Sequence, residues 1–384
     1  MTMIPKIRFS EFVEEWKETK LEDLLIVNSG KDYKHLKEGN IPVYGTGGYM
    51  LSVDQSLSSS DAIGIGRKGT IDKPQFLKAP FWTVDTLFFL TLRKKDDLKF
   101  LYNLAQKLDW RKYDESTGVP SLSKSNIINI EVSTPTLSEQ RRISQFFTLL
   151  DETIRLEGER LASLKQVKAA SLQSFFPQEG EKEPRVRFKG FSGEWKKVRL
   201  GDCGFTYSGI GFPEKEQGGQ SGIPFYKVSD MNNIGNEHIM ISSNNYVSKK
   251  QIEENHWNVC KSVPAIFFAK VGAAVLLDRK RLVVEPCICD NNTMMYCLDT
   301  KIWDKYFCLK CFENIRLSAL IQVGTLPSYN ASTIENIEVF IPTLAEQCAL
   351  STYFTNIDEQ IRLEREKIEK MKKVKGACLE GMMV

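Results

Sequence analysis

A passage of 26 residues occurs twice in this chain, and this repeat limits the fold more than any other feature. Residues 135–160 and 342–367 align without gaps at an offset of 207, and 15 of the 26 positions are identical. A shorter match opens each half, where residues 8–16 and 187–195 both run from Arg-Phe to Glu-Trp at an offset of 179. The difference (207 − 179) places 28 extra residues in the second half. The sequence therefore predicts a doubled frame with two different middle segments.

Length and composition agree with two globular domains. A chain of 384 residues exceeds one typical core, and 42% hydrophobic and 26% charged residues are ordinary for globular proteins. The net charge of +3 neither requires nor excludes a nucleic-acid partner. The longest apolar run, Ala265 to Leu277, is interrupted by Lys270 and is too short to span a bilayer. We expect no membrane segment and no signal peptide, and hence a cytoplasmic protein.

Each repeated passage has the pattern of a helix start. Thr136 and Glu139, like Thr343 and Glu346, fit a capping box, in which the Thr hydroxyl accepts from the Glu N–H and the Glu carboxylate accepts from the Thr N–H. Apolar residues then form a narrow stripe typical of a coiled-coil seam. The expected seam residues are Leu150, Ile154, Leu161, Leu164, Ile357, Ile361, Ile368 and Met371. Two similar stripes favour antiparallel pairing of the helices. The alternative is that each helix packs on its own domain.

The remaining segments carry short β-type runs separated by turn residues. The first half has such runs at Ile41–Tyr44, Ala62–Ile65, Phe81–Val84, Leu87–Leu90 and Ile127–Val132. The second half has them at Ile223–Tyr226, Ala265–Phe268, Ala274–Leu277 and Ile337–Phe340. One helix is expected in each half, near residues 98–108 and 303–320. The predicted fold is α+β: sheet-centred domains at 1–135 and 187–342, repeated helices at 136–176 and 343–384, and a charged linker at 177–186.

The sequence offers no convincing active site. Gly64 to Gly69 matches the dinucleotide pattern G-x-G-x-x-G, but Pro74 follows closely and a helix cannot start cleanly there. All nine cysteines lie at or after Cys203, and the Cys308–Cys311 pair falls in an apparently helical segment, so we expect reduced thiols. None of the three histidines is paired at metal-ligand spacing. We therefore expect no catalytic residue, no metal and no cofactor bound by this chain.

Two turns suggest an anionic partner instead. Arg67 and Lys68 lie in the glycine-rich turn of the first half, and alignment of the halves matches Arg67 with Lys270 and Gly69 with Gly272. Amide, aromatic and small residues lie nearby in the sequence. Such side chains suit DNA grooves, where Asn can pair with adenine and Arg or Lys with guanine. The candidate DNA contacts are Tyr44, Gly47, Tyr49, Arg67, Lys68, Tyr226, Lys227, Asn232 and Lys270.

The doubled P-T-L-x-E-Q helix, preceded each time by a W-x-x-x-x-L-x-D opening and a variable domain, resembles the specificity (S) subunit of Type I restriction-modification systems. The resemblance spans residues 8 to 379. It implies two target-recognition domains joined by an antiparallel coiled coil and related by a pseudo-twofold axis. Each domain would read one half of a bipartite, asymmetric site in double-stranded DNA.

The resemblance also implies partners and their cofactors. The family is not itself catalytic, and it recruits two methyltransferase subunits that use S-adenosylmethionine to methylate adenine. In the full complex it also recruits restriction subunits, which use ATP and Mg²⁺. The helical copies differ at Arg141-Arg142 and Cys348-Ala349, so docking of the two methyltransferases need not be identical. Two other hypotheses remain: a coiled-coil scaffold with two protein-binding domains, and a nucleotide-binding enzyme built on Gly64 to Gly69.

Overall fold

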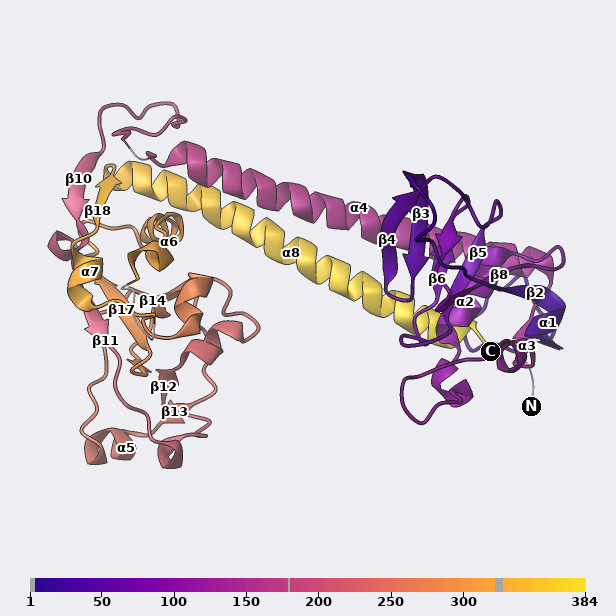
Figure 1. The fold of residues 1–384 in the computed structure, drawn as a ribbon. Helices are drawn as coiled ribbons and strands as arrows, with labels where there is room; N and C mark the ends of the chain where they lie inside the picture. Colours follow the sequence, from indigo (N-terminus) through magenta and orange to yellow (C-terminus); the bar gives the residue numbers. More distant parts are fainter. Residues whose placement is uncertain (1–3, 179, 322–326) are drawn as a thin grey trace. The chain divides into compact units, whose positions relative to one another are not determined.

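The computed structural model describes residues 4–178, 180–321 and 327–384. Its internal contacts divide the chain into two compact units. Unit 1 comprises residues 1–160 and 364–384, and unit 2 comprises residues 161–363. Each unit holds a sheet-centred body and part of each of two 39-residue helices, α4 (Leu137–Phe175) and α8 (Leu344–Met382) (Figure 1). The boundaries between the units thus fall within the helices rather than at their ends.

Two sheets form the body of unit 1. A four-stranded antiparallel sheet has the order β2-β8-β5-β6, and a three-stranded sheet has the order β4-β3-β7, with β3 and β7 parallel. The strands of the first sheet are β2 (Leu25–Ser29), β8 (Leu87–Leu92), β5 (Ala62–Gly66) and β6 (Gln75–Leu77). Those of the second are β4 (Gly48–Val53), β3 (Glu38–Gly45) and β7 (Trp82–Thr83). Every residue of β5 is buried, as expected of a central strand covered on both faces.

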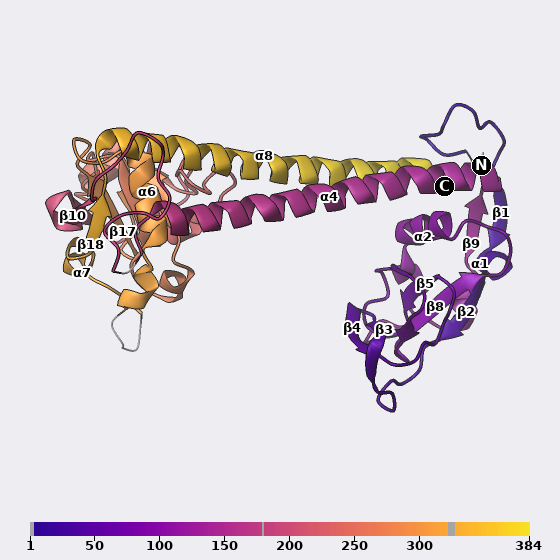
Figure 2. The same cartoon turned by 90° about the horizontal axis from the view of Figure 1, so that it is seen from above.

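Short elements complete unit 1. The strand β1 (Lys17–Lys20) pairs with β9 (Glu131–Thr134), next to helices α1 (Leu21–Leu24) and α3 (Lys124–Ile128). Helix α2 (Leu98–Lys107) packs beside the four-stranded sheet and is followed by the 3₁₀ helix η1 (Trp110–Tyr113) (Figure 2). The Asp97 carboxylate caps α2 by accepting a hydrogen bond from the N–H of Phe100 at 2.9 Å.

Unit 2 repeats this architecture. Its sheets have the orders β11-β17-β14-β15 and β13-β12-β16, with β12 and β16 parallel, and β10 pairs with β18. The strands are β10 (Lys196–Arg199), β11 (Gly204–Ser208), β12 (Ile223–Tyr226), β13 (Tyr246–Val247), β14 (Ala265–Ala269), β15 (Lys280–Val283), β16 (Ile288–Cys289), β17 (Thr293–Leu298) and β18 (Glu338–Ile341). The helices are α5 (Lys249–Glu254), α6 (Lys305–Asn314) and α7 (Ala331–Glu335). The 3₁₀ helices are η2 (Leu200–Asp202), η3 (Glu214–Glu216), η4 (Val228–Asn232), η5 (Ala273–Leu277) and η6 (Leu317–Leu320).

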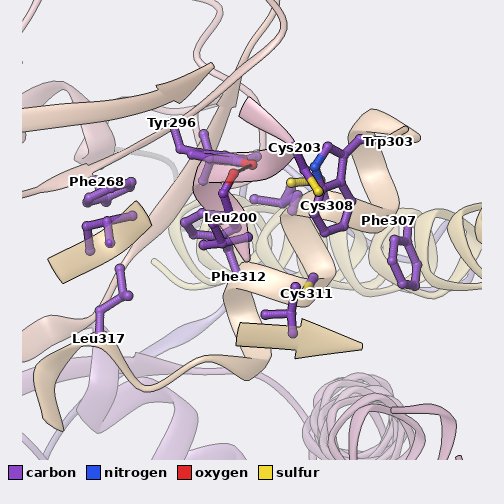
Figure 3. Close-up of a cluster of buried hydrophobic side chains, with 14 of the residues drawn as sticks. Leu200, Cys203, Phe268, Tyr296, Trp303, Phe307, Cys308, Cys311, Phe312 and Leu317 are labelled. Atoms are coloured by element: carbon purple, nitrogen blue, oxygen red, sulfur yellow. Dashed lines mark hydrogen bonds between the residues drawn. The ribbon is translucent and has the colours of Figure 1, made fainter. Parts of the chain in front are cut away.

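Aromatic side chains join helix α6 to the sheet of unit 2. The ring of Phe312 lies 5.9 Å from that of Phe268 on β14 and 5.2 Å from that of Tyr296 on β17 (Figure 3). Cys308 and Cys311 lie in the same buried cluster, on α6. Burial raises the pKa of both thiols, that of Cys311 to about 12, so they are protonated at neutral pH. These cysteines serve as small core side chains.

The long helices carry a stripe with alternating spacings of four and three residues. Its apolar members include the eight residues expected from the sequence, which are half-buried in α4 and mostly buried in α8. Further members are Ile143, Phe147, Phe175, Leu350 and Phe354. The same stripe contains the charged residues Glu157, Lys168, Glu364 and Lys375. A spacing of 3.5 residues that is maintained over the whole helix is the pattern of a coiled-coil seam.

Contacts across the seam show that the helices run antiparallel. In unit 1, Asp151 contacts Lys375 at 2.6 Å, and Arg160 contacts Glu364 at 3.4 Å. In unit 2, Lys168 contacts Asp358 at 2.7 Å. The pairs Asp151–Lys375 and Lys168–Asp358 are copies of each other at the offset of 207, with the two helices exchanged. The predicted α+β fold with two sheet-centred domains and an antiparallel helix pair is confirmed.

The start of each long helix differs in one respect from the predicted capping box. The Thr136 hydroxyl accepts the N–H of Glu139 at 3.5 Å, as expected. However, the Glu139 carboxylate binds Arg8 with two hydrogen bonds of 2.8 Å rather than returning to Thr136. Unit 2 repeats this ion pair with Arg187 and Glu346, at 2.7 Å for both bonds. The predicted bond back to the threonine is wrong because a buried carboxylate is stabilised more strongly by a bidentate guanidinium.

The first and last described segments meet within unit 1. The N–H of Ile7 donates to the carbonyl of Gly381 near the end of α8, at 2.8 Å. In unit 2 the equivalent bond joins Val186 to Ser174, at 3.0 Å, and there the linker connects the two segments covalently. The same backbone bond thus closes this junction in both units.

Some predicted strands are wrong. Ala274–Leu277 lies in η5, and Leu276 and Leu277 are 60% and 61% exposed. Ile127 and Ile128 belong to α3, so that strand begins at Glu131. Short apolar runs fit several structures, and here the local turn chemistry decides. Across the described ranges, no helix combines the length and apolar character needed to cross a bilayer.

Candidate nucleic-acid interface

The turn after β5 carries two exposed cations. The N–H of Arg67 donates to the carbonyl of Thr86 at 2.8 Å, and that of Gly69 donates to the carbonyl of Pro120 at 2.8 Å. Gly69 has a φ of +89°, a conformation that side chains with a Cβ rarely adopt. The backbone of the turn is therefore fixed, while the side chains of Arg67 and Lys68 project into solvent.

Unit 2 forms the same turn after β14. Lys270 donates its N–H to the carbonyl of Asn292 at 2.8 Å, and Gly272 donates to the carbonyl of Pro327 at 2.9 Å, with a φ of +84°. The alignment of Arg67 with Lys270 and of Gly69 with Gly272 is confirmed by these matching bonds. The position of Lys68, however, is taken by Val271 in unit 2, so this turn carries one cation instead of two.

A hairpin lies beside the cationic turn of unit 1. Tyr44 and Tyr49 face each other across strands β3 and β4, with ring centroids 6.4 Å apart, and Gly47 lies exposed at the tip. Tyr49 is 63% exposed, whereas Tyr44 is half-buried. The Gln75 side chain fixes the hairpin by donating to the carbonyl of Gly45 at 2.9 Å. The structure thus brings together the five candidates of unit 1.

The counterpart of this hairpin in unit 2 differs. Tyr226 is 3% exposed, its hydroxyl donates to the carbonyl of Met240 at 3.1 Å, and burial raises its pKa. Tyr226 is therefore a core residue instead of the exposed DNA contact that the sequence predicts. Lys227 is half-buried and donates to Gln217 Oε1 at 3.1 Å, and the exposed Asn232 accepts from Arg279 at 2.6 Å.

Most of the extra sequence of unit 2 lies in this region. The offset between equivalent residues is 182 at Tyr44 and Tyr226 and 203 at Arg67 and Lys270. Hence 21 (203 − 182) of the 28 extra residues separate these two points. They replace the tight hairpin of unit 1 with η4, a longer loop and α5.

Sequence reasoning missed a third turn in each unit. Residues 84–86 join β7 to β8, and residues 290–292 join β16 to β17. Val84 donates its N–H to Tyr44 at 3.0 Å, and Asp290 likewise donates to Tyr226 at 2.9 Å. Because Thr86 and Asn292 accept from the cationic turns, this third turn ties the other two segments together. Its sequence signal is weak, because Val-Asp-Thr in unit 1 and Asp-Asn-Asn in unit 2 are triplets that many ordinary loops share.

We call this convergence of three turns the three-turn edge. In unit 1 it comprises residues 44–49, 67–69 and 84–86, and in unit 2 residues 226–232, 270–272 and 290–292. Within the described part of the chain, Arg67, Lys68 and Lys270 form no ion pair, although the Arg67 guanidinium lies 5.8 Å from the Phe88 ring. Unpaired cations beside exposed amide and hydroxyl groups suit phosphates and base edges.

Asp290 places a carboxyl group beneath the edge in unit 2. It is 6% exposed, and its Oδ1 atom has no hydrogen-bond partner among the described residues. Burial raises the pKa of Asp290, while the nearby Asn292, Thr293 and Lys227 oppose this effect. Val84 occupies the equivalent position in unit 1, so the two edges differ in charge as well as in shape.

The structure does not support a dinucleotide site at Gly64 to Gly69. The first three of these residues belong to β5 and the last three to the cationic turn. The next regular element is the strand β6 instead of a helix. A pyrophosphate would therefore find no helix N-terminus at this motif.

Comparisons with known proteins agree with this geometry. The family model described as "Type I restriction modification DNA specificity domain" matches residues 13–166 and again residues 192–373. The MjaVIII specificity subunit of a Type I restriction enzyme from Methanocaldococcus jannaschii is 25% identical over 333 residues, covering 82% of this chain and 74% of that protein. The MjaIX specificity subunit of the same organism is 21% identical over 309 residues, covering 74% and 68%.

Solved structures show the same fold. The S subunit of a Type I restriction-modification system from M. genitalium superposes with a TM-score of 0.68 at 13% identity, covering 100% of this chain and 99% of that one. A chain from a structure concerned with complex assembly of the type I R-M system gives a TM-score of 0.60 at 15% identity, covering 95% and 96%. Two matches to one family model cover most of the sequence. The chain therefore belongs to the family of Type I restriction-modification DNA specificity subunits.

Proposed function

We propose that each unit reads one half of a bipartite, asymmetric DNA site and that helices α4 and α8 set the distance between the halves. The observation that carries this proposal is the three-turn edge, which recurs on one backbone frame with different side chains. A repeated frame gives both readers the same means of approaching DNA. The differences between Lys68 and Val271 and between Val84 and Asp290 give each reader its own preference.

Phosphate binding would come from the cations of the edge. Arg67, Lys68 and Lys270 are free to contact phosphates, and each contact releases counterions from DNA. The net charge of the chain is only +3, so these local cations, and not the overall charge, would determine the affinity for DNA.

Helices α4 and α8 provide a spacer. The seam runs from Ile143 to Phe175 and from Leu350 to Met382, about 50 Å at 1.5 Å per residue. The charged residues Glu157, Lys168, Glu364 and Lys375 continue the apolar pattern over this length. The ion pairs Asp151–Lys375 and Lys168–Asp358 would fix the register of the two helices.

We further propose that the chain performs no chemistry of its own. It would dock two methyltransferase subunits, which supply S-adenosylmethionine chemistry, and restriction subunits that use ATP and Mg²⁺. The starts of α4 and α8 have the same structure, because the ion pairs Arg8–Glu139 and Arg187–Glu346 hold them in the same way. They would offer each methyltransferase an equivalent surface.

Two measurements test the proposal. The chain is co-expressed with its methyltransferase subunit, and methylated adenines are mapped at base resolution. We expect methylation at a split sequence with two different halves at a constant separation. Methylation at an undivided or palindromic sequence would contradict the proposal.

A mobility-shift assay separates this function from that of a protein-binding scaffold. The complex should bind duplex DNA with an affinity that falls steeply as salt increases. A scaffold with two protein-binding domains predicts no such DNA affinity.

A further inference from the structure

The turns at residues 84–86 and 290–292 both present an exposed side chain at their second position. Leu87 donates its N–H to Val84 at 3.0 Å, and Thr293 donates to Asp290 at 3.0 Å, so both are tight turns with the same bond. Asp85 and Asn291 are the second residues of these turns, and both are exposed. Their neighbours Thr86 and Asn292 accept the N–H groups of Arg67 and Lys270. Each of the two residues therefore lies in a segment whose backbone is bonded to a cationic turn of the three-turn edge.

Turn formation does not explain these two side chains. Asp and Asn are common in turns because they bond to nearby backbone N–H groups, usually from the first position. Throughout residues 4–178, 180–321 and 327–384, neither Asp85 nor Asn291 forms a side-chain hydrogen bond or ion pair. Both side chains keep their full bonding capacity for a partner.

The charge of Asp85 limits what that partner can be. A carboxylate near phosphates is repelled, so the favourable DNA contact left to it is an amino group on a base edge. Cytosine N4 offers such a donor in the major groove. The neutral amide of Asn291 both donates and accepts, which matches the N6 and N7 atoms of adenine.

We propose that Asp85 and Asn291 determine specificity at equivalent positions of the two half-sites. Asp85 accepts from the amino group of a cytosine in the half read by unit 1, and Asn291 pairs with an adenine in the half read by unit 2. This inference rests on the proposed bipartite reading, and it assigns that reading to a turn which the sequence did not single out.

The test uses the co-expressed complex with Asp85→Asn and, separately, Asn291→Asp. Methylated sites are mapped, and binding is measured on duplexes that differ at single base pairs. We expect Asp85→Asn to reduce discrimination at one position of one half by about tenfold, with a gain for adenine there. Asn291→Asp should act at one position of the other half, and the separation of the halves should stay constant.

Matched controls are Glu18→Gln on β1 and Asn314→Asp at the end of α6. Both residues are exposed, lie outside the three-turn edge and should leave every position unchanged.

Unchanged preferences in both variants would overturn the inference while leaving bipartite recognition intact. A uniform loss of binding to all sequences, with unaltered thermal unfolding, would also overturn it. If the proposed function itself fails, the unmodified complex already shows no bipartite methylation. The single-base-pair binding series gives a result even for a variant that methylates poorly.

Discussion

At the scale of residues, Lys310 shows how the two units differ. Its side chain is 2% exposed, and its ammonium group contacts Asp358 at 2.6 Å and Glu313 at 3.0 Å. At the equivalent positions of unit 1, Asn103 and Gln106 bond to each other at 3.2 Å. The ion pair between Lys168 and Asp358 is therefore part of a buried network in unit 2. Its copy in unit 1, between Lys375 and Asp151, has no charged residues at the positions equivalent to Lys310 and Glu313.

This difference predicts unequal effects of two matching substitutions. Asp358→Asn leaves buried ammonium groups with weaker partners and should reduce the free energy of unfolding by about 3–5 kcal/mol. The copy, Asp151→Asn, involves a side chain that is 46% exposed and should cost about 0–1 kcal/mol. Urea denaturation followed by tryptophan fluorescence measures both. Equal losses would show that the buried network of unit 2 does not add to the free energy of unfolding.

The cost of Asp358→Asn should depend on pH. Burial acts to raise the pKa of Asp358, but attraction to Lys310, His238 and Lys168 outweighs it, so the pKa lies below its usual range. Glu313, the other carboxylate of the network, acts against this lowering. A carboxyl group with a lowered folded-state pKa stabilises the fold above its unfolded pKa, about 3.9, and loses that effect as pH falls through the folded value. The difference in the free energy of unfolding between the unmodified chain and Asp358→Asn should therefore shrink as the pH falls below about 4.

Lys270 allows a direct test of phosphate contact. Lys270→Ala should weaken DNA binding for all sequences and lower the slope of log K against log salt by about one unit. Lys301, an exposed cation in the turn before α6, is the matched control and should change neither quantity. Titrations at several salt concentrations give the slope. An unchanged slope would exclude Lys270 as a phosphate contact.

The sequence predicted the cations of the three-turn edge but not the burial of every residue beside them. Arg67 and Lys270 were matched correctly because glycine fixes the turn that follows each of them. Tyr226 was misplaced because identical residue types at equivalent positions can face solvent in one unit and the core in the other. The third turn, with Asp85 and Asn291, has only a weak local signal, since its role depends on bonds to segments distant in sequence.

At the scale of elements, the long helices were the most predictable. A regular apolar spacing over 39 residues fits only a long helix, whereas the four residues Ala274–Leu277 fit a strand or a 3₁₀ helix equally well. The charged seam positions Glu157 and Glu364 were not expected. They lie in the stripe because their neighbours supply enough apolar area and because Lys367 and Arg160 pair with them.

Lengthening both helices tests their role as a spacer. Seven residues inserted after Leu161 and seven after Glu364 preserve the alternation of four and three, and keep the pairs Asp151–Lys375 and Lys168–Asp358. The gap in the methylated site should grow by roughly 3 base pairs, for an added rise of about 10 Å. Both half-sites should keep their sequences. A changed half-site with an unchanged gap would contradict a spacer role.

At the scale of the whole molecule, the repeat of helix starts predicts the composition of the complex. Native mass spectrometry should find two methyltransferase subunits for each copy of this chain. The variant Arg141→Cys with Arg142→Ala gives α4 the residues of α8 and should keep this ratio. In the unmodified chain, Arg142 contacts Glu11 at 3.6 Å, so some loss of stability in unit 1 is expected. A ratio of one to one in the unmodified complex would refute equivalent docking.

The bond between Ile7 and Gly381 has a consequence for the order in which the segments of such a chain can follow one another. Both units hold this junction by the same backbone hydrogen bond, so the fold fixes which segments are neighbours but not which of them comes first in the sequence. A variant with the linker cut and residues 384 and 1 of this sequence joined would carry the same segments in a different order.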